Sequence, residues 1–121
     1  MLNLPPSVRV FVARFPTDMR RSFNGLSALV IDVVKEDPQS GHLFVFVGRR
    51  KNLVKILWWD RSGYLVLAKR LEHGRFNFFD RVSTSRTSFE IRASDLALLL
   101  EGIDLRGAKK RISHEEIVAL S

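Results

Sequence analysis

Apolar and polar positions alternate with a period of two near the start of the chain. Val8, Val10 and Val12 fall on one side of residues 8–14, and Pro16 follows shortly after. This alternation predicts a first β-strand, because successive strand side chains point to opposite faces of a sheet. The strand is expected to end before Pro16, which has no backbone N–H to donate.

The pattern then changes to helical spacing. Apolar residues recur at Met19, Phe23, Leu26, Val30 and Val33. Their spacing predicts an amphipathic helix within residues 18–35, begun by Thr17 and Asp18, with a bend near Gly25. The outward face of this helix would carry Arg20 and Arg21.

Three further runs, Leu43–Val47, Leu53–Trp59 and Tyr64–Arg70, are rich in β-branched and aromatic residues. They predict an antiparallel three-stranded meander. Residues 60–63 have the composition of a type I turn with Gly63 in the left-handed position.

A three-residue loop at this turn would fix the register of the last two strands. Asp60 would then face Tyr64. The expected pairs are Ile56 with Ala68, Trp58 with Val66, and Lys55 with Lys69. Two adjacent lysines would favour a phosphate or carboxylate nearby, or both side chains would diverge into water.

The last part of the chain predicts a connector over residues 80–87, a short strand over 88–92 and a helix of leucines at 96–100, capped by Ser94 and Asp95 and ended by Gly102.

The fold class is therefore α+β: a single small domain over residues 1–105, whose mostly antiparallel sheet carries one packed helix and a short C-terminal helix. Residues 106–121 form a basic C-terminal tail that is expected to be flexible.

Charge adds a functional indication. The 121 residues include 20 Lys and Arg against 13 Asp and Glu, a formal net charge of +7. An excess of this sign favours phosphate backbones or acidic protein surfaces, although solubility alone also explains it.

The cations concentrate in the meander and just after it. Arg49, Arg50 and Lys51 form an exposed loop, because three adjacent cations cannot be buried unpaired. The predicted nucleic-acid-binding residues are Arg49, Arg50, Lys51, Lys55, Lys69, Arg70 and Arg75. The alternative is a solubilising loop that protects a sheet edge.

Trp58 and Trp59 are adjacent, so in a strand they point to opposite faces. One of them belongs to the core. We predict Trp59, with Tyr64, as the partner-binding pair, able to stack on a base or anchor a protein.

Catalysis is not predicted. The histidines His42, His73 and His114 show no metal-ligand spacing, cysteine is absent, and phosphate-loop and nucleophile-elbow motifs are missing. No metal and no cofactor are expected. Without a membrane-spanning run, a cytoplasmic location is the expectation.

Four blocks of the chain carry a family resemblance. They are Asp18-Met19-Arg20 with Gly25-Leu26; Ser40 to Phe46 (SGHLFVF); Lys55 to Asp60 (KILWWD) with Gly63; and Lys69 to Phe76 (KRLEHGRF). In this order and spacing they resemble the second-reading-frame accessory proteins (TnpB type) of the insertion-sequence sixty-six group of bacterial transposable elements. The chain departs from the family pattern at residues 77–79 and at Leu105.

The resemblance implies a non-catalytic accessory role in DNA transposition, with DNA and the separate transposase of the same element as partners. One alternative is an assembly factor that bridges transposase subunits without touching DNA. Another is a small metal-dependent nuclease that uses carboxylates such as Asp18, Asp32 and Asp60.

Overall fold

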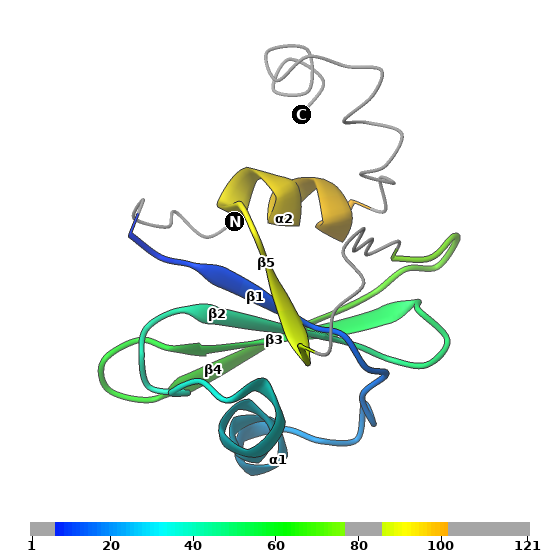
Figure 1. Cartoon of the computed structure of the whole chain (residues 1–121). Helices are drawn as coiled ribbons and strands as arrows, with labels where there is room; N and C mark the ends of the chain where they lie inside the picture. Colours follow the sequence, from blue (N-terminus) through cyan, green and yellow to red (C-terminus); the bar gives the residue numbers. More distant parts are fainter. Residues whose placement is uncertain (1–6, 77–85, 102–121) are drawn as a thin grey trace.

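The computed structural model describes residues 7–76 and 86–101 (Figure 1). Five strands form one sheet, with a helix against each face. The elements are β1 (Val10–Ala13), α1 (Phe23–Leu29), the π-helical turn η1 (Val30–Val34), β2 (Leu43–Val47), β3 (Leu53–Trp59), β4 (Tyr64–Arg70), β5 (Ser88–Ile91) and α2 (Ala93–Leu100). The predicted domain boundary at residue 105 and the tail 106–121 lie outside the described residues.

The sheet has the strand order β4-β3-β2-β1-β5. Strands β1 and β2 run parallel, joined by the crossover through α1 and η1, and the other three neighbouring pairs are antiparallel. The predicted α+β class, the mostly antiparallel sheet and the β2-β3-β4 meander are confirmed.

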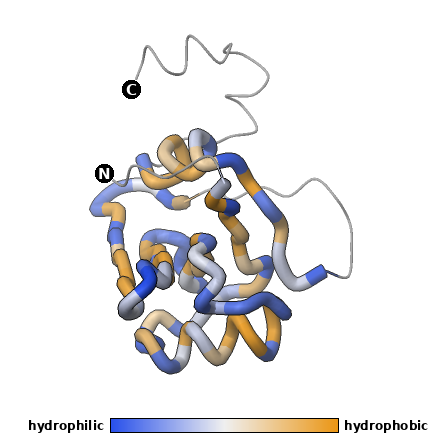
Figure 2. The backbone as a smooth tube through the Cα atoms, turned by 90° about the vertical axis from the view of Figure 1, so that its left-hand side faces the viewer, coloured by the Kyte–Doolittle hydropathy of each residue, from blue (hydrophilic) through white to orange (hydrophobic). Residues whose placement is uncertain are grey.

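The alternating strand pattern divides the core between the two faces of the sheet. Helix α1 lies below the sheet in Figure 1 and α2 above it, and hydrophobic residues recur along both helices and the strands in Figure 2. On the α1 face, the buried cluster comprises Phe11, Ala13, Leu26, Val30, Val34, Phe44, Phe46 and Leu57. On the α2 face it comprises Val10, Val12, Leu43, Val45, Val54, Ile56, Phe76, Leu96 and Leu100. Leu96 and Leu100 therefore place the C-terminal helix against this face of the sheet.

Helix α1 lies within the predicted range, but the prediction that it begins at Thr17 and Asp18 is wrong. Thr17 remains extended, because its N–H donates to the Val47 carbonyl at 2.9 Å and it pairs with Gly48 in a parallel bridge. Asp18 instead accepts a hydrogen bond from the backbone N–H of Arg20 at 3.0 Å. The segment before α1 is consequently tied to the end of β2.

The predicted register of β3 and β4 is wrong by one residue. Trp59 pairs with Tyr64, so the loop has four residues, 60–63. The Asp60 carboxylate accepts from the Gly63 N–H at 3.3 Å, the Asp60 N–H donates to the Gly63 carbonyl at 3.1 Å, and Arg61, not Gly63, takes the left-handed conformation with φ 83°.

The shift moves every predicted pair. Ile56 now lies opposite Leu67, Trp58 opposite Leu65, and Lys55 opposite Ala68. Lys69 faces Val54, so Lys55 and Lys69 point to opposite faces of the sheet and do not form a like-charged pair.

The N-cap of helix α2 lies two residues before the predicted Ser94. It is Arg92, and the Asp95 carboxylate accepts from the Arg92 backbone N–H at 3.4 Å. A carboxylate in the first turn stabilises the unpaired N–H groups of a helix start. Among the residues that the structure describes, no helix is both long and apolar enough to span a bilayer.

Candidate functional site

The loop of residues 48–52 between β2 and β3 is held rigidly. The Gly48 N–H donates to the Leu53 carbonyl at 3.0 Å, and Lys51 has a left-handed backbone with φ 62°. Two further backbone bonds tie this loop to the segment after β4: Phe76 N–H to the Lys51 carbonyl at 2.6 Å and Leu71 N–H to the Asn52 carbonyl at 2.7 Å. The loop therefore presents its exposed cations from a fixed backbone.

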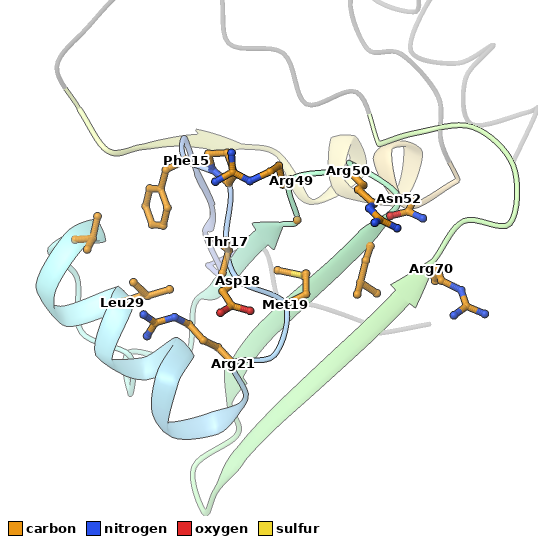
Figure 3. A pocket seen from close by; sticks show the side chains of 14 residues that line it. Phe15, Thr17, Asp18, Met19, Arg21, Leu29, Arg49, Arg50, Asn52 and Arg70 are labelled. Atoms are coloured by element: carbon orange, nitrogen blue, oxygen red, sulfur yellow. The ribbon is translucent and has the colours of Figure 1, made fainter.

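A groove of about 850 Å³ lies between this loop and the start of α1 (Figure 3). We call it the arginine groove, because its cationic lining is Arg21, Arg49, Arg50 and Arg70. The remaining lining residues are Phe15, Pro16, Thr17, Asp18, Met19, Leu29, Val33, Gly48, Asn52 and Leu53. Guanidinium groups and apolar side chains thus share one concave surface.

Two smaller hollows border the same loop. One, of about 380 Å³, is lined in part by Arg14, Arg49 and Lys51. The other, of about 370 Å³, is lined by residues 49–52 with Gly74 and Arg75. Together the three hollows define what we call the basic end of the sheet, with the cations Arg14, Arg21, Arg49, Arg50, Lys51, Arg70 and Arg75.

Acidic groups offset little of this charge. Among the described residues, Asp18 is the one carboxylate in the linings of the three hollows; it lines the arginine groove and forms an ion pair with Arg20 at 2.7 Å. The hydrogen bonds from the Arg20 side chain and backbone hold the pKa of the Asp18 carboxyl well below its usual value. Arg70 pairs with Glu72 at 3.1 Å, in an exposed geometry that contributes little energy. The basic end is strongly positive at neutral pH.

The structure brings five of the seven predicted nucleic-acid-binding residues to this end. They are Arg49, Arg50, Lys51, Arg70 and Arg75. Lys55 lies on the α1 face, and its ammonium group donates a hydrogen bond to the Arg21 carbonyl at 2.8 Å. Lys69 lies on the opposite face, across from Val54. The contact of any of these residues with DNA stays a prediction.

Arg14 and Arg21 join the basic end without having been predicted. Arg14 directly follows β1, and its guanidinium donates to the Arg86 carbonyl at 3.1 Å. Arg21 was assigned to the outward face of a helix, whereas it precedes α1 and donates to the Gly25 carbonyl at 3.4 Å. The topology of the sheet is the signal that could have identified Arg14. The carboxyl ends of parallel strands meet at one edge of a sheet, so a residue directly after β1 lies near the residues after β2.

Trp59 and Tyr64 form the last pair of the β3-β4 hairpin, at the other end of these strands from residues 48–52. Their rings meet edge to face at 5.0 Å, and both side chains are partly exposed. The predicted partner-binding pair is thus separated from the basic end by the length of β3, about 20 Å. Its role as a protein contact stays a prediction.

The candidate nuclease carboxylates are dispersed. Asp18 pairs with Arg20 at the basic end, while Asp60 closes the β3-β4 turn at the opposite end of the hairpin. Asp32 is exposed on η1. Within residues 7–76 and 86–101, no group of three or more His, Cys, Asp or Glu side chains is placed to hold a metal ion.

Gly48 gives a direct test of the packing beneath the loop. A Cβ at this position would lie 2.7 Å from Met19 Cγ. We expect Gly48→Ala to lower the free energy of unfolding by about 1–3 kcal/mol, because Met19 must move out of its site. Urea unfolding measures the change, and Gly63→Ala is the control, since a Cβ there meets nothing within 4 Å. An equal loss in both variants would contradict the close approach of Met19.

The fold and the basic end define a small α+β protein with a strongly positive surface at one end of its sheet. The chain belongs to the IS66 Orf2-like family, whose profile matches residues 8–110. The resemblance seen in the sequence is confirmed, and membership indicates an accessory protein of transposition.

Two curated proteins of Sinorhizobium fredii (strain NBRC 101917 / NGR234) are similar over nearly their full lengths. The uncharacterized protein y4hO is 41% identical over 106 residues, which cover 88% of this chain and 90% of that protein. The uncharacterized protein y4jC is 32% identical over 111 residues, 92% of each chain. No solved structure matches the chain significantly.

Proposed function

We propose that this protein is a non-catalytic accessory subunit of transposition that binds DNA through the basic end of its sheet. The observation that carries the proposal is the convergence of cations from five separate segments on three adjoining hollows, whose linings include one carboxylate, Asp18, among the described residues. Phosphate contacts of this kind supply affinity without sequence information.

Rigidity supports the same proposal. Four backbone hydrogen bonds fix the loop 48–52 to itself, to β3 and to the segment 71–76. Arginine and lysine side chains on a fixed backbone lose less conformational freedom when they bind than the same side chains on a mobile loop. The basic end is therefore suited to hold a polyanion at a defined orientation.

The transposase of the same element is the second proposed partner. Trp59 and Tyr64, at the end of the β3-β4 hairpin away from the loop 48–52, supply an aromatic contact that leaves the basic end open for DNA. Tyr and Trp are enriched among the residues that dominate protein interfaces. Simultaneous binding would let the protein bring transposase to the element.

Fluorescence anisotropy with a labelled duplex tests DNA binding. We expect a Kd in the micromolar range at low salt that weakens steeply as salt is added, as counterion release requires. A pull-down with purified transposase in the absence of DNA tests the alternative of a protein-only assembly factor. Capture of transposase, together with no change in the anisotropy of any duplex at low salt, would overturn the proposal.

A further inference from the structure

The arginine groove differs chemically from the two hollows beside it. Its four cations are all arginines, whereas Lys51 lines both neighbouring hollows. Arginine combines bidentate recognition of phosphate with a flat face that stacks on aromatic rings. Phe15 and Leu29, both labelled in Figure 3, lie on the side of the groove away from Arg70. The groove thus offers charge and an apolar wall together.

Thr17 adds an unsatisfied polar group to this groove. The residue is 5% exposed, and its Oγ1 is buried with no hydrogen-bond partner among the described residues. Its backbone is fixed, since its N–H donates to the Val47 carbonyl. Buried hydroxyls are nearly always paired with protein, water or ligand, so a water molecule or a polar group of a ligand at the groove wall would satisfy this one.

We propose that the arginine groove receives unpaired nucleotides of DNA, with a base against Phe15 and the apolar wall and the adjoining phosphates on Arg49 and Arg50. This inference rests on the proposed DNA binding and specifies the form of DNA. The bases of an intact duplex are stacked inside the helix, so a duplex reaches only the rim, whereas an unpaired base enters a concave site. A volume of about 850 Å³ lies within the range of about 300–1,000 Å³ typical of ligand sites.

The surroundings of the groove favour nucleic acid over an acidic peptide. The two neighbouring hollows continue the positive lining with Arg14, Lys51 and Arg75. A DNA strand that extends out of the groove therefore meets further cations on either side of the loop 48–52. Regularly spaced phosphates match this continuation, while a peptide would need an unusually long acidic run.

The test compares an intact duplex with the same duplex interrupted by a gap of about five nucleotides. We expect the wild-type protein to bind the gapped duplex about five- to a hundred-fold more tightly, the range that stacking of one base on an aromatic side chain provides. Phe15→Ala should remove this preference and leave intact-duplex affinity within about two-fold. Phe23→Ala is the matched control, because Phe23 is 48% exposed and does not line the groove.

Phe15→Leu provides a second variant should Phe15→Ala fail to fold. It keeps an apolar side chain in the wall but removes the aromatic ring, so it should also remove the preference for the gap. Equal wild-type affinity for both DNAs would overturn the groove inference and leave the proposed function standing, whereas binding to neither DNA would overturn both. A peptide of glutamate and leucine that binds wild type but not Arg49→Gln with Arg50→Gln, without any gap preference, would assign the groove to a protein and also overturn the inference.

Discussion

Phe44→Ala is expected to lower the free energy of unfolding by about 3–5 kcal/mol. Phe44 is 1% exposed at the centre of the sheet, and its ring stacks on Phe11 with centroids 5.6 Å apart. Alanine leaves a cavity between the sheet and α1 that the surrounding side chains fill only in part. Because small domains are stable by about 5–15 kcal/mol, the loss is a large fraction of the total.

Urea unfolding followed by circular dichroism measures this loss. Phe23→Ala is the matched control: the same ring is removed from a site that is 48% exposed, so a change within about 0.5 kcal/mol is expected. Equal losses in the two variants would show that the α1 face is not the packed core described above.

The double variant Arg49→Gln, Arg50→Gln is expected to weaken binding to duplex DNA about ten-fold or more at 0.1 M salt. Both side chains are exposed on the fixed loop, and both line the arginine groove and the hollow beside Arg75. An arginine that no longer neutralises a phosphate also no longer releases a counterion, and this release is the main source of non-specific affinity. Glutamine preserves much of the side-chain length while removing the charge.

A charge-matched control comes from the other end of the sheet. Lys35 and Arg61 are exposed cations with left-handed backbones, φ 64° and 83°, a conformation that asparagine tolerates. Lys35→Asn with Arg61→Asn therefore lowers the net charge by the same amount without touching the basic end. We expect it to weaken binding by about two-fold at most. Equal weakening by both double variants would mean that only net charge matters.

The local parts of the fold followed from the sequence, and the non-local parts did not. The bounds of β2, β3 and β4 were predicted because their apolar runs are bordered by turn residues. The β3-β4 register was missed because the Asp60 side chain lengthens the turn by one residue. The start of α1 was missed because Thr17 bonds to Val47, thirty positions later in the chain.

The candidate site divides in the same way. Arg49, Arg50 and Lys51 were predicted to be exposed because adjacent cations cannot be buried, and the structure places them so. Lys55 and Lys69 were grouped with them by sequence proximity, but the shifted register separates the two lysines onto opposite faces. Arg14 and Arg21 enter through the parallel pairing of β1 and β2, which no local pattern of residues indicates.

The salt dependence of DNA affinity tests the central claim most directly, since it counts the phosphates that the basic end neutralises. Log affinity is plotted against log salt concentration for wild type, for Arg49→Gln with Arg50→Gln, and for Lys35→Asn with Arg61→Asn. The basic-end variant is predicted to flatten the slope by about 1.8, which is two phosphates at about 0.9 each, while the control keeps the wild-type slope. Identical slopes for all three proteins would contradict the account.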